Sequence, residues 1–419
     1  MTRRRKKTIG RRQFLARSTA AGAALWALSP TARVLGANDR LRLGLIGGGA
    51  RGQELLSQAL KLPNVELVAV ADVYTRRHDE VHRVAPAARA FRDHRRLIEL
   101  QEVDAVLVAS PLHCHGRHFL DTIAAGKDLY SEKTMTWSIP EAEACLAAAK
   151  RSDRVIQIGL QHVSTGAFAD ARKWVADGVV GKVTSVQSWM SRNTPRGHGQ
   201  WVRSVPSDCT ADNVQWDLFL NGRPARPFDA FRFINWRLFW EFSGGNITEN
   251  MVHQLSWIMG VLDLPVPVAA YMSGGVFSEK DGREVPDTIA VTLDFPTDLV
   301  VTWQSTFSNS RYGLGERILG SHGTVERVSG STDMVTGRLT SGVRYDPEKA
   351  NRPDGAAVLG QSPDQDHMAN FVDCVRSRKT PNAPVEVGYR TAVAAHMANL
   401  AYRQKARVTA EMAMATGDR

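Results

Sequence analysis

The feature that most constrains the fold is a glycine-rich turn between an apolar strand and a helix. An apolar strand from residue 40 runs into Gly47, Gly49 and Gly52, and a helical stretch follows over residues 53–60. In G-x-G-x-x-G, the first glycine makes a tight turn, the second lets a pyrophosphate approach, and the third lets the helix pack closely. The helix N-terminus then faces the phosphates. The expected cofactor contacts from this turn are Gly47, Gly49, Ala50, Arg51 and Gly52.

An acidic residue at the end of the second strand indicates which dinucleotide binds. The strand over residues 65–72 ends in Asp72, where a carboxylate can accept hydrogen bonds from the adenosine ribose. This favours NAD as the cofactor. Arg76 and Arg77 follow and could reach a 2'-phosphate, so NADP stays possible.

Strands alternate with helices as far as residue 159, which predicts a parallel, doubly wound sheet of the Rossmann type. Ligands on such sheets bind at the carboxyl ends of the strands. We therefore expect one crevice lined by Ser110, Pro111, His115, Glu132 and Lys133. The expected strands cover residues 103–110, 128–131 and 155–159, and the expected helices cover 92–100, 115–125 and 139–151.

After Gly159 the pattern changes to β-rich stretches with few helices, which predicts an antiparallel open sheet. The fold class is therefore α/β, with an N-terminal Rossmann sheet and a C-terminal α+β domain that has a large, mostly antiparallel open sheet. We expect these domains over residues 38–160 and 161–419. The expected strands cover 183–191, 266–276, 287–295, 299–307 and 316–328, and the expected helices cover 168–177, 365–376 and 389–404.

The basic charge of the chain is concentrated at its N-terminus. The formal net charge is +10, and the first 37 residues hold nine Lys and Arg and no Asp or Glu. The remainder is close to neutral, so a nucleic-acid partner is not expected.

Residues 1–37 have the parts of an export signal: a basic stretch, an apolar stretch over residues 14–28 and small residues ending near Ala37. Arg11-Arg12-Gln13-Phe14-Leu15 looks like a twin-arginine motif, whose pathway exports folded proteins. We expect the twin-arginine translocation machinery as a partner and a periplasmic location. If the signal is not cleaved, the protein stays at the membrane.

The four cysteines are widely spaced, and a protein that folds in reducing cytoplasm does not depend on bridges, so we expect free thiols. A disulfide stays possible because the destination is oxidising. His113, Cys114, His115 and His118 match no standard metal site, so no metal is expected.

Three segments resemble the family of glucose-fructose oxidoreductase, inositol dehydrogenase and rhizopine-catabolism proteins. Residues 109–115 and 125–133 resemble its T-P-x-x-x-H and A-G-K-x-V-x-x-E-K-P signatures, and residues 244–253 resemble G-G-x-x-x-D-x-x-x-H. The resemblance covers essentially the whole chain after the leader. The chain departs from the family at Thr134, which usually is proline, and at Glu249, which usually is aspartate.

The resemblance implies that Lys133 lies beside the nicotinamide and the substrate hydroxyl, that His253 is the acid/base, and that Glu249 assists. Glu249 and His253 are four residues apart. On a helix that begins near Thr248, their side chains therefore share one face. Other roles stay open: Lys133 as a solvated charge, His253 as a core histidine and Glu249 as a helix cap. The family also implies a homo-oligomer built on the outer face of the second sheet.

The substrate contacts are expected from Gln161 and His162, which follow the last Rossmann strand, and from Arg192 and Asn193, which follow a strand of the second domain. Seven of the ten tryptophans lie in the second domain between Trp189 and Trp303, and aromatic rings both fill cores and stack on sugars.

The sequence therefore predicts an NAD(P)-dependent oxidoreductase that transfers hydride from a carbinol carbon of a sugar, polyol or glycoside. Because no soluble NAD pool is expected outside the cytoplasm, we expect a tightly bound, recycled cofactor. A redox-neutral glycoside hydrolase or lyase that oxidises its substrate transiently is the first alternative. A sugar-binding protein without activity is the second.

Overall fold

The computed structural model describes residues 40–194, 199–296, 298–332 and 339–416. Arg40–Arg419 forms one compact unit. The predicted twin-arginine signal lies outside the described residues. No helix of the described part of the chain is long and apolar enough to cross a membrane.

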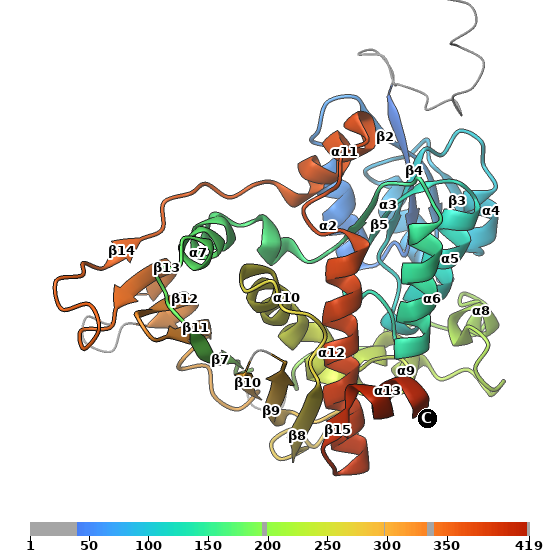
Figure 1. The fold of residues 1–419 in the computed structure, drawn as a ribbon. Coiled ribbons are helices and arrows are strands. Elements are labelled where there is room, and N and C mark those ends of the chain that lie inside the picture. The colour runs from blue at the N-terminus through green and yellow to red at the C-terminus, as the bar shows by residue number, and fades with distance from the viewer. Residues whose placement is uncertain (1–39, 195–198, 297, 333–338, 417–419) are drawn as a thin grey trace, which may run out of the picture. The chain divides into compact units, whose positions relative to one another are not determined.

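The first sheet has six parallel strands in the order β3-β2-β1-β4-β5-β6. Figure 1 shows it in the blue to cyan part of the chain. This is the Rossmann order, in which the strand sequence reverses between β1 and β4 and leaves a crevice at their carboxyl ends. Its strands are β1 (Leu41–Ile46), β2 (Val65–Ala71), β3 (Arg89–Phe91), β4 (Ala105–Val108), β5 (Asp128–Ser131) and β6 (Ile156–Ile158). Its helices are α2 (Ala50–Ala59), α3 (Thr75–His82), α4 (His94–Ile98), α5 (His115–Ala124) and α6 (Ile139–Lys150).

The second sheet has nine strands in the order β14-β13-β12-β11-β7-β10-β9-β8-β15. All its pairs are antiparallel except β10 with β7. The predicted fold class is thus confirmed. The strands are β7 (Val183–Ser191), β8 (Ala269–Gly275), β9 (Thr288–Phe295), β10 (Leu299–Thr306), β11 (Leu314–Gly320), β12 (Gly323–Thr332), β13 (Leu339–Pro347), β14 (Val358–Leu359) and β15 (Val408–Thr409).

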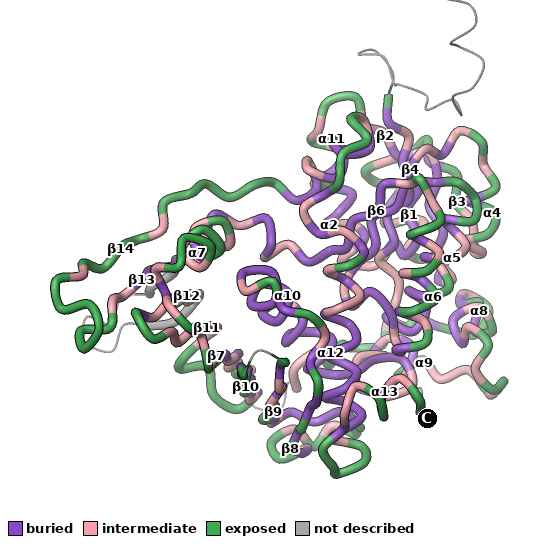
Figure 2. The backbone as a smooth tube through the Cα atoms, in the orientation of Figure 1, coloured by how far each residue is buried: buried purple, intermediate pink, exposed green. Residues whose placement is uncertain are grey.

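Helix α12 (Val385–Gln404) contacts both α6 of the Rossmann part and β8 of the second sheet. Figure 2 shows α12 and α10 (Val252–Val261) as largely buried. One apolar core therefore extends across both sheets. The remaining helices of this part are α7 (Gly166–Ala176), α11 (His367–Ser377) and α13 (Ala410–Thr416).

Residues 199–242 form a segment, named here the bridging segment, that has a hydrophobic cluster of its own. It contains the short helices α8 (Trp216–Leu220) and α9 (Ala230–Ile234) and the 3-10 turn η3 (Trp236–Leu238). Its aromatic side chains pack around Tyr74, which lies three residues beyond the end of β2. The bridging segment is thus anchored to the Rossmann sheet.

One predicted element is wrong, and another differs in its first turn. The single strand expected over residues 316–328 is a hairpin, because Gly320 and Gly323 pair across a two-residue turn and divide β11 from β12. The helix expected from Thr248 begins as a π-helix, η4 (Ile247–Met251), and becomes α-helical only at α10.

Candidate active site

Two of the three turn glycines are required by the fold, and the third faces open space. Gly47 has φ +93°, and a Cβ there would lie 2.7 Å from the backbone of Ala109 and Ser110. A Cβ on Gly52 would lie 1.9 Å from the carbonyl oxygen of Gly47. A Cβ on Gly49 would meet nothing within 4 Å. Gly49 is therefore the position at which a ligand can approach the backbone.

The Asp72 carboxylate connects the second strand to this turn. It accepts hydrogen bonds from the Gly48 N–H at 2.7 Å and the Tyr74 N–H at 2.9 Å. Burial raises the pKa of Asp72, although these hydrogen bonds oppose the shift. The Arg76 guanidinium pairs with Asp208 and Glu80.

Two cavities flank Gly47 and Asp72. One, of about 310 Å³, extends toward the second domain, and the other, of about 230 Å³, extends over α5. Their position at the carboxyl ends of β1, β2 and β4, together with the open side of Gly49, fits an extended dinucleotide. The larger cavity is lined by Gly47, Gly49, Ala50, Arg51, Asp72, Arg77, Pro111, Arg203 and Arg237 among others, and the smaller by Gly47, Asp72, Ser110, Pro111, Cys114 and His118 among others.

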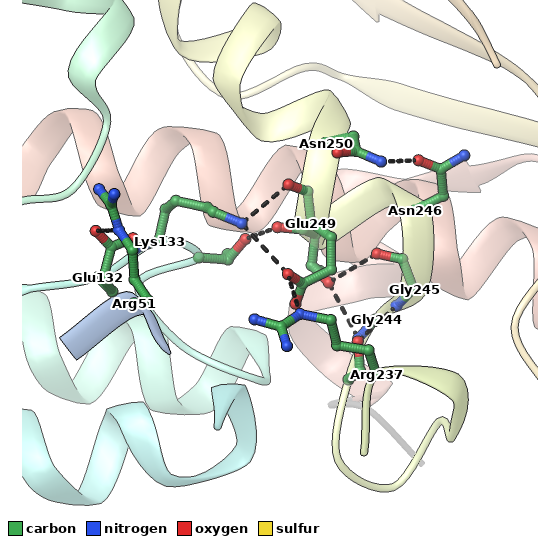
Figure 3. Close-up of polar contacts among 12 residues, drawn as sticks. Arg51, Glu132, Lys133, Arg237, Gly244, Gly245, Asn246, Glu249 and Asn250 are labelled. Atoms are coloured by element: carbon green, nitrogen blue, oxygen red, sulfur yellow. Dashed lines mark hydrogen bonds and ion pairs between the residues drawn. The ribbon is translucent and has the colours of Figure 1, made fainter. Parts of the chain in front are cut away.

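Lys133 and Arg237 both point toward Glu249 (Figure 3). The Lys133 Nζ donates to the Glu249 carbonyl oxygen at 2.9 Å and lies 3.4 Å from its Oε2, while the Arg237 Nε donates to Oε2 at 3.0 Å. Burial acts to raise the pKa of Glu249, but the charges of Lys133 and Arg237 outweigh it, so this pKa is lowered. The recorded partners of the Glu249 carboxylate are the side chains of Lys133 and Arg237. Glu249 is therefore an ionised group that fixes Lys133.

Glu132 fixes the same lysine from the other side. Its Oε1 accepts from the Arg51 Nε at 2.8 Å, and its Oε2 accepts from the Lys133 N–H at 3.0 Å. The Gln161 amide also donates to Glu132, at 3.3 Å. Arg51 of the glycine turn is thus joined through Glu132 to the loop that carries Lys133 (Figure 3).

His253 lies one helical turn beyond Glu249, next to His162. Their ring centroids are 5.2 Å apart, and the His162 Nδ1 lies 3.2 Å from the His253 carbonyl oxygen. Burial, followed by the charge of Lys133, lowers the pKa of His253 well below its ordinary value. The Nδ1 of His253 is buried without a hydrogen-bond partner among the described residues. His253 is therefore held as a neutral imidazole, the protonation state that a general base requires, and its lowered pKa makes it a weaker base than a free histidine.

His115 holds two loops of the crevice together. Its Nδ1 lies 2.7 Å from the Thr134 carbonyl oxygen and its Nε2 lies 2.8 Å from the Ser110 carbonyl oxygen. Thr134, which replaces the family's proline, follows a cis peptide bond and donates through its hydroxyl to the Thr248 carbonyl oxygen at 2.8 Å. The contacts recorded for His115 are therefore with the protein backbone.

The predicted substrate residues divide into two groups. Gln161 and His162 lie beside Glu132 and His253, as described above. Arg192 is half-buried, has no recorded side-chain partner among the described residues, and lies near enough to His253 for its charge to lower that pKa. Asn193 is exposed and forms a β-bridge with Ser308, with no recorded contact to Lys133, Glu249 or His253 in the described part of the chain.

Arg237 is a functional candidate that the sequence alone did not indicate. Nothing in the local pattern Trp236-Arg237-Leu238 marks it, because its partner Glu249 is identified only by proximity in space.

The described residues contain no group of three or more His, Cys, Asp and Glu that could hold a metal ion. All four cysteines are buried and none forms a disulfide.

Two family models match the chain. The model "Oxidoreductase family, NAD-binding Rossmann fold" matches residues 41–160, and "Oxidoreductase family, C-terminal alpha/beta domain" matches residues 215–410. The chain belongs to the Gfo/Idh/MocA oxidoreductase family, and its N-terminal part is an NAD-binding Rossmann domain. The prediction of NAD is thus confirmed.

Curated relatives with known activities include inositol dehydrogenases. The scyllo-inositol 2-dehydrogenase (NAD(+)) of Bacillus subtilis is 26% identical over 34% of this chain and 42% of the relative. The inositol 2-dehydrogenase of Acidothermus cellulolyticus is 26% identical over 70% of this chain and 74% of the relative. Three inositol dehydrogenases are matched over only 42%, 53% and 43% of their own length.

Solved structures share the fold over nearly their whole length. The aldose-aldose oxidoreductase from Caulobacter crescentus has a TM-score of 0.64 at 19% identity, covering 88% of this chain and 99% of that protein. At this level of identity the likeness concerns the fold alone.

Proposed function

We propose that the protein is an NAD-dependent oxidoreductase that acts on a carbinol carbon of a sugar or polyol. The observation that carries the proposal is the convergence of Lys133, Glu249 and the neutral His253 beside the glycine turn. Bound NAD would supply the hydride acceptor for oxidation of a C–H bond. The inositol dehydrogenases named above act on polyols and support this substrate class.

In this proposal the protein residues orient the substrate and move one proton. His253 accepts the hydroxyl proton of the substrate as a general base. Lys133 donates a hydrogen bond to the same hydroxyl oxygen, because Glu249 and Glu132 hold its side chain and backbone in one place. Arg237 donates to the Glu249 Oε2, and its positive charge helps to keep that carboxylate ionised.

The test uses a panel of polyols and sugars, including inositols and glycosides, with NAD. With one substrate alone we expect absorbance at 340 nm that stops at about one equivalent of bound NADH, and a product two mass units lighter. With a second sugar added as hydride acceptor we expect turnover, and Lys133→Ala should lower its kcat/KM by roughly 100-fold or more. Lys182→Ala changes an exposed lysine and is the matched control. Release of an aglycone without net oxidation would instead establish redox-neutral cleavage, and unchanged activity in Lys133→Ala would contradict the role of this lysine.

We further propose that the cofactor is held tightly and recycled, and that the twin-arginine pathway exports the protein to the periplasm. The support is the leader sequence, since a protein exported in the folded state can carry its cofactor with it. Protein purified without added nucleotide should release stoichiometric dinucleotide on denaturation. Replacement of Arg11 and Arg12 by lysine should abolish its recovery from the periplasmic fraction, whereas unchanged recovery would contradict this route.

We propose also that the protein is a homo-oligomer. Exposed aromatic side chains lie on or beside strands of the second sheet, and large exposed apolar groups often mark protein interfaces: Tyr271, Phe277 and Tyr312. Light scattering after gel filtration should give a multiple of the monomer mass. A monomer at all concentrations would contradict the proposal.

A further inference from the structure

The bridging segment is attached beside the dinucleotide crevice by backbone and side-chain contacts. Tyr74 forms a β-bridge with Val214 and an edge-on ring contact with Phe233 at 5.7 Å. The Gln215 N–H donates to the Val73 carbonyl oxygen at 2.8 Å. Tyr74 is only 1% exposed. The segment is therefore fixed to the end of β2, where the cofactor's ribose is expected.

Arg203 of this segment lines the same cavity of about 310 Å³ as Gly47 and Gly49. Its backbone is held by Asn235, which is 1% exposed. The Asn235 Oδ1 accepts from the Arg203 N–H at 2.7 Å, and the Asn235 amide donates to the Arg203 carbonyl oxygen at 3.2 Å. The buried side-chain amide of Asn235 thus positions the backbone of Arg203, which lines the cavity.

The cavity has more positive charge than its own acidic residues balance. Arg77 pairs with Glu80, Arg237 pairs with Glu249, and Arg203 has no recorded carboxylate partner in the described part of the chain. Arg203 is an exposed residue of the cavity wall, and partial desolvation of its guanidinium, followed by the charges of Arg237 and Arg77, lowers its pKa.

The acidic residues of the cavity wall are engaged elsewhere. Glu54 pairs with Arg51, and Asp72 accepts backbone hydrogen bonds. Because like charges that converge in a cavity repel one another, the arrangement favours a bound anion beside Gly49.

We propose that Arg203 binds the pyrophosphate of the dinucleotide together with the glycine turn, so that the bridging segment retains the cofactor. This inference rests on the proposed function. Residues 161–214, which include Arg203, lie between the two family-model matches. An arginine offers a planar fork of donors that matches phosphate oxygens, and such charge-assisted hydrogen bonds are stronger than neutral ones.

The experiment compares wild-type protein with Arg203→Gln, Arg203→Lys and the control Arg96→Gln, which changes an exposed arginine of α4. The first readout is the rate at which bound dinucleotide is released, followed by mass spectrometry. The second is the affinity for ADP-ribose and for adenosine, measured by calorimetry after the bound dinucleotide has been removed. Thermal unfolding checks that each variant is folded.

We expect Arg203→Gln to weaken ADP-ribose binding by about 10- to 100-fold and to accelerate dinucleotide release to a similar extent. Adenosine, which has no pyrophosphate, should bind as before. Arg203→Lys should be intermediate, because it keeps the charge and loses the fork. Arg96→Gln should match wild type.

Equal ADP-ribose affinity in Arg203→Gln and wild type would overturn the inference and leave the proposed function intact. A parallel loss of adenosine affinity would also overturn it, because Arg203 would then act on the shape of the crevice. A wild-type protein that binds neither NAD nor ADP-ribose would overturn the proposed function itself.

Discussion

Replacing Gly49 or Gly52 by alanine should separate cofactor binding from folding. Gly49 has φ −68° and ψ −176°, which any residue adopts, and an added Cβ meets nothing within 4 Å. Alanine restricts the unfolded chain, which favours folding by about 0.4–1 kcal/mol, but at the N-cap of α2 it is less favourable than glycine. Because these effects oppose each other, Gly49→Ala should change the free energy of unfolding by less than about 1 kcal/mol. The folded protein has no steric reason to resist this change.

Gly52→Ala should instead lower the free energy of unfolding. Its Cβ would lie 1.9 Å from the Gly47 carbonyl oxygen, whereas ordinary contact begins at 3.4 Å, so the backbone must move by about 1.5 Å. Overpacking of this kind costs about 1–3 kcal/mol, and the upper end applies because the obstacle is backbone.

For cofactor binding, the methyl group of Gly49→Ala occupies the space through which a pyrophosphate approaches. If the overlap between this methyl group and the pyrophosphate costs about 1–3 kcal/mol, as overpacking does, NAD should bind about 5- to 150-fold more weakly. Urea denaturation followed by circular dichroism gives the stability, and calorimetry with NAD gives the affinity. Wild-type affinity in Gly49→Ala, or a stability loss above about 1 kcal/mol, would refute the assignment of Gly49 as the point of approach.

Three further outcomes are expected. Glu249→Gln leaves Lys133 and Arg237 without their shared carboxylate and should lower the free energy of unfolding by about 3 kcal/mol in urea titrations, whereas no change would contradict the ion-pair geometry. Because the pKa of His253 is lowered, kcat/KM should not begin its acidic decline until well below pH 6.5, and a decline at or above pH 6.5 would exclude this base. Burial lowers the pKa of His113 to about 3, so between pH 6.5 and 3 the unfolded chain binds more protons and stability falls with decreasing pH by roughly 1.4 kcal/mol per unit. His113→Gln should reduce that slope in denaturation measured at pH 5 and 7, and an unchanged slope would contradict the origin given for it.

The bounds of a strand were predicted correctly where a hydrophobic pattern defines them, and incorrectly where a short turn does. The strands over residues 128–131 and 183–191 have the predicted bounds, because an apolar or alternating run sets each of them. The hairpin of β11 and β12 was missed because its β-rich pattern continues through the turn at Ser321 and His322. The bridging segment was missed because its apolar residues show no regular period and cluster only around Tyr74.

Sequence by itself determined the dinucleotide turn, the parallel first sheet and the candidates Lys133, Glu249 and His253. The turn and the sheet follow from steric demands and periodicity within short stretches of chain, whereas the three candidates are implied by the resemblance to the family's signatures. The tertiary structure decided that Arg237 shares Glu249 with Lys133, that Arg51 reaches Glu132, and that Arg203 lines the cavity of the glycine turn. Electrostatic and hydrogen-bond partners are selected by distance in space, and residues 116 positions apart, such as Lys133 and Glu249, meet only once the two sheets have packed together.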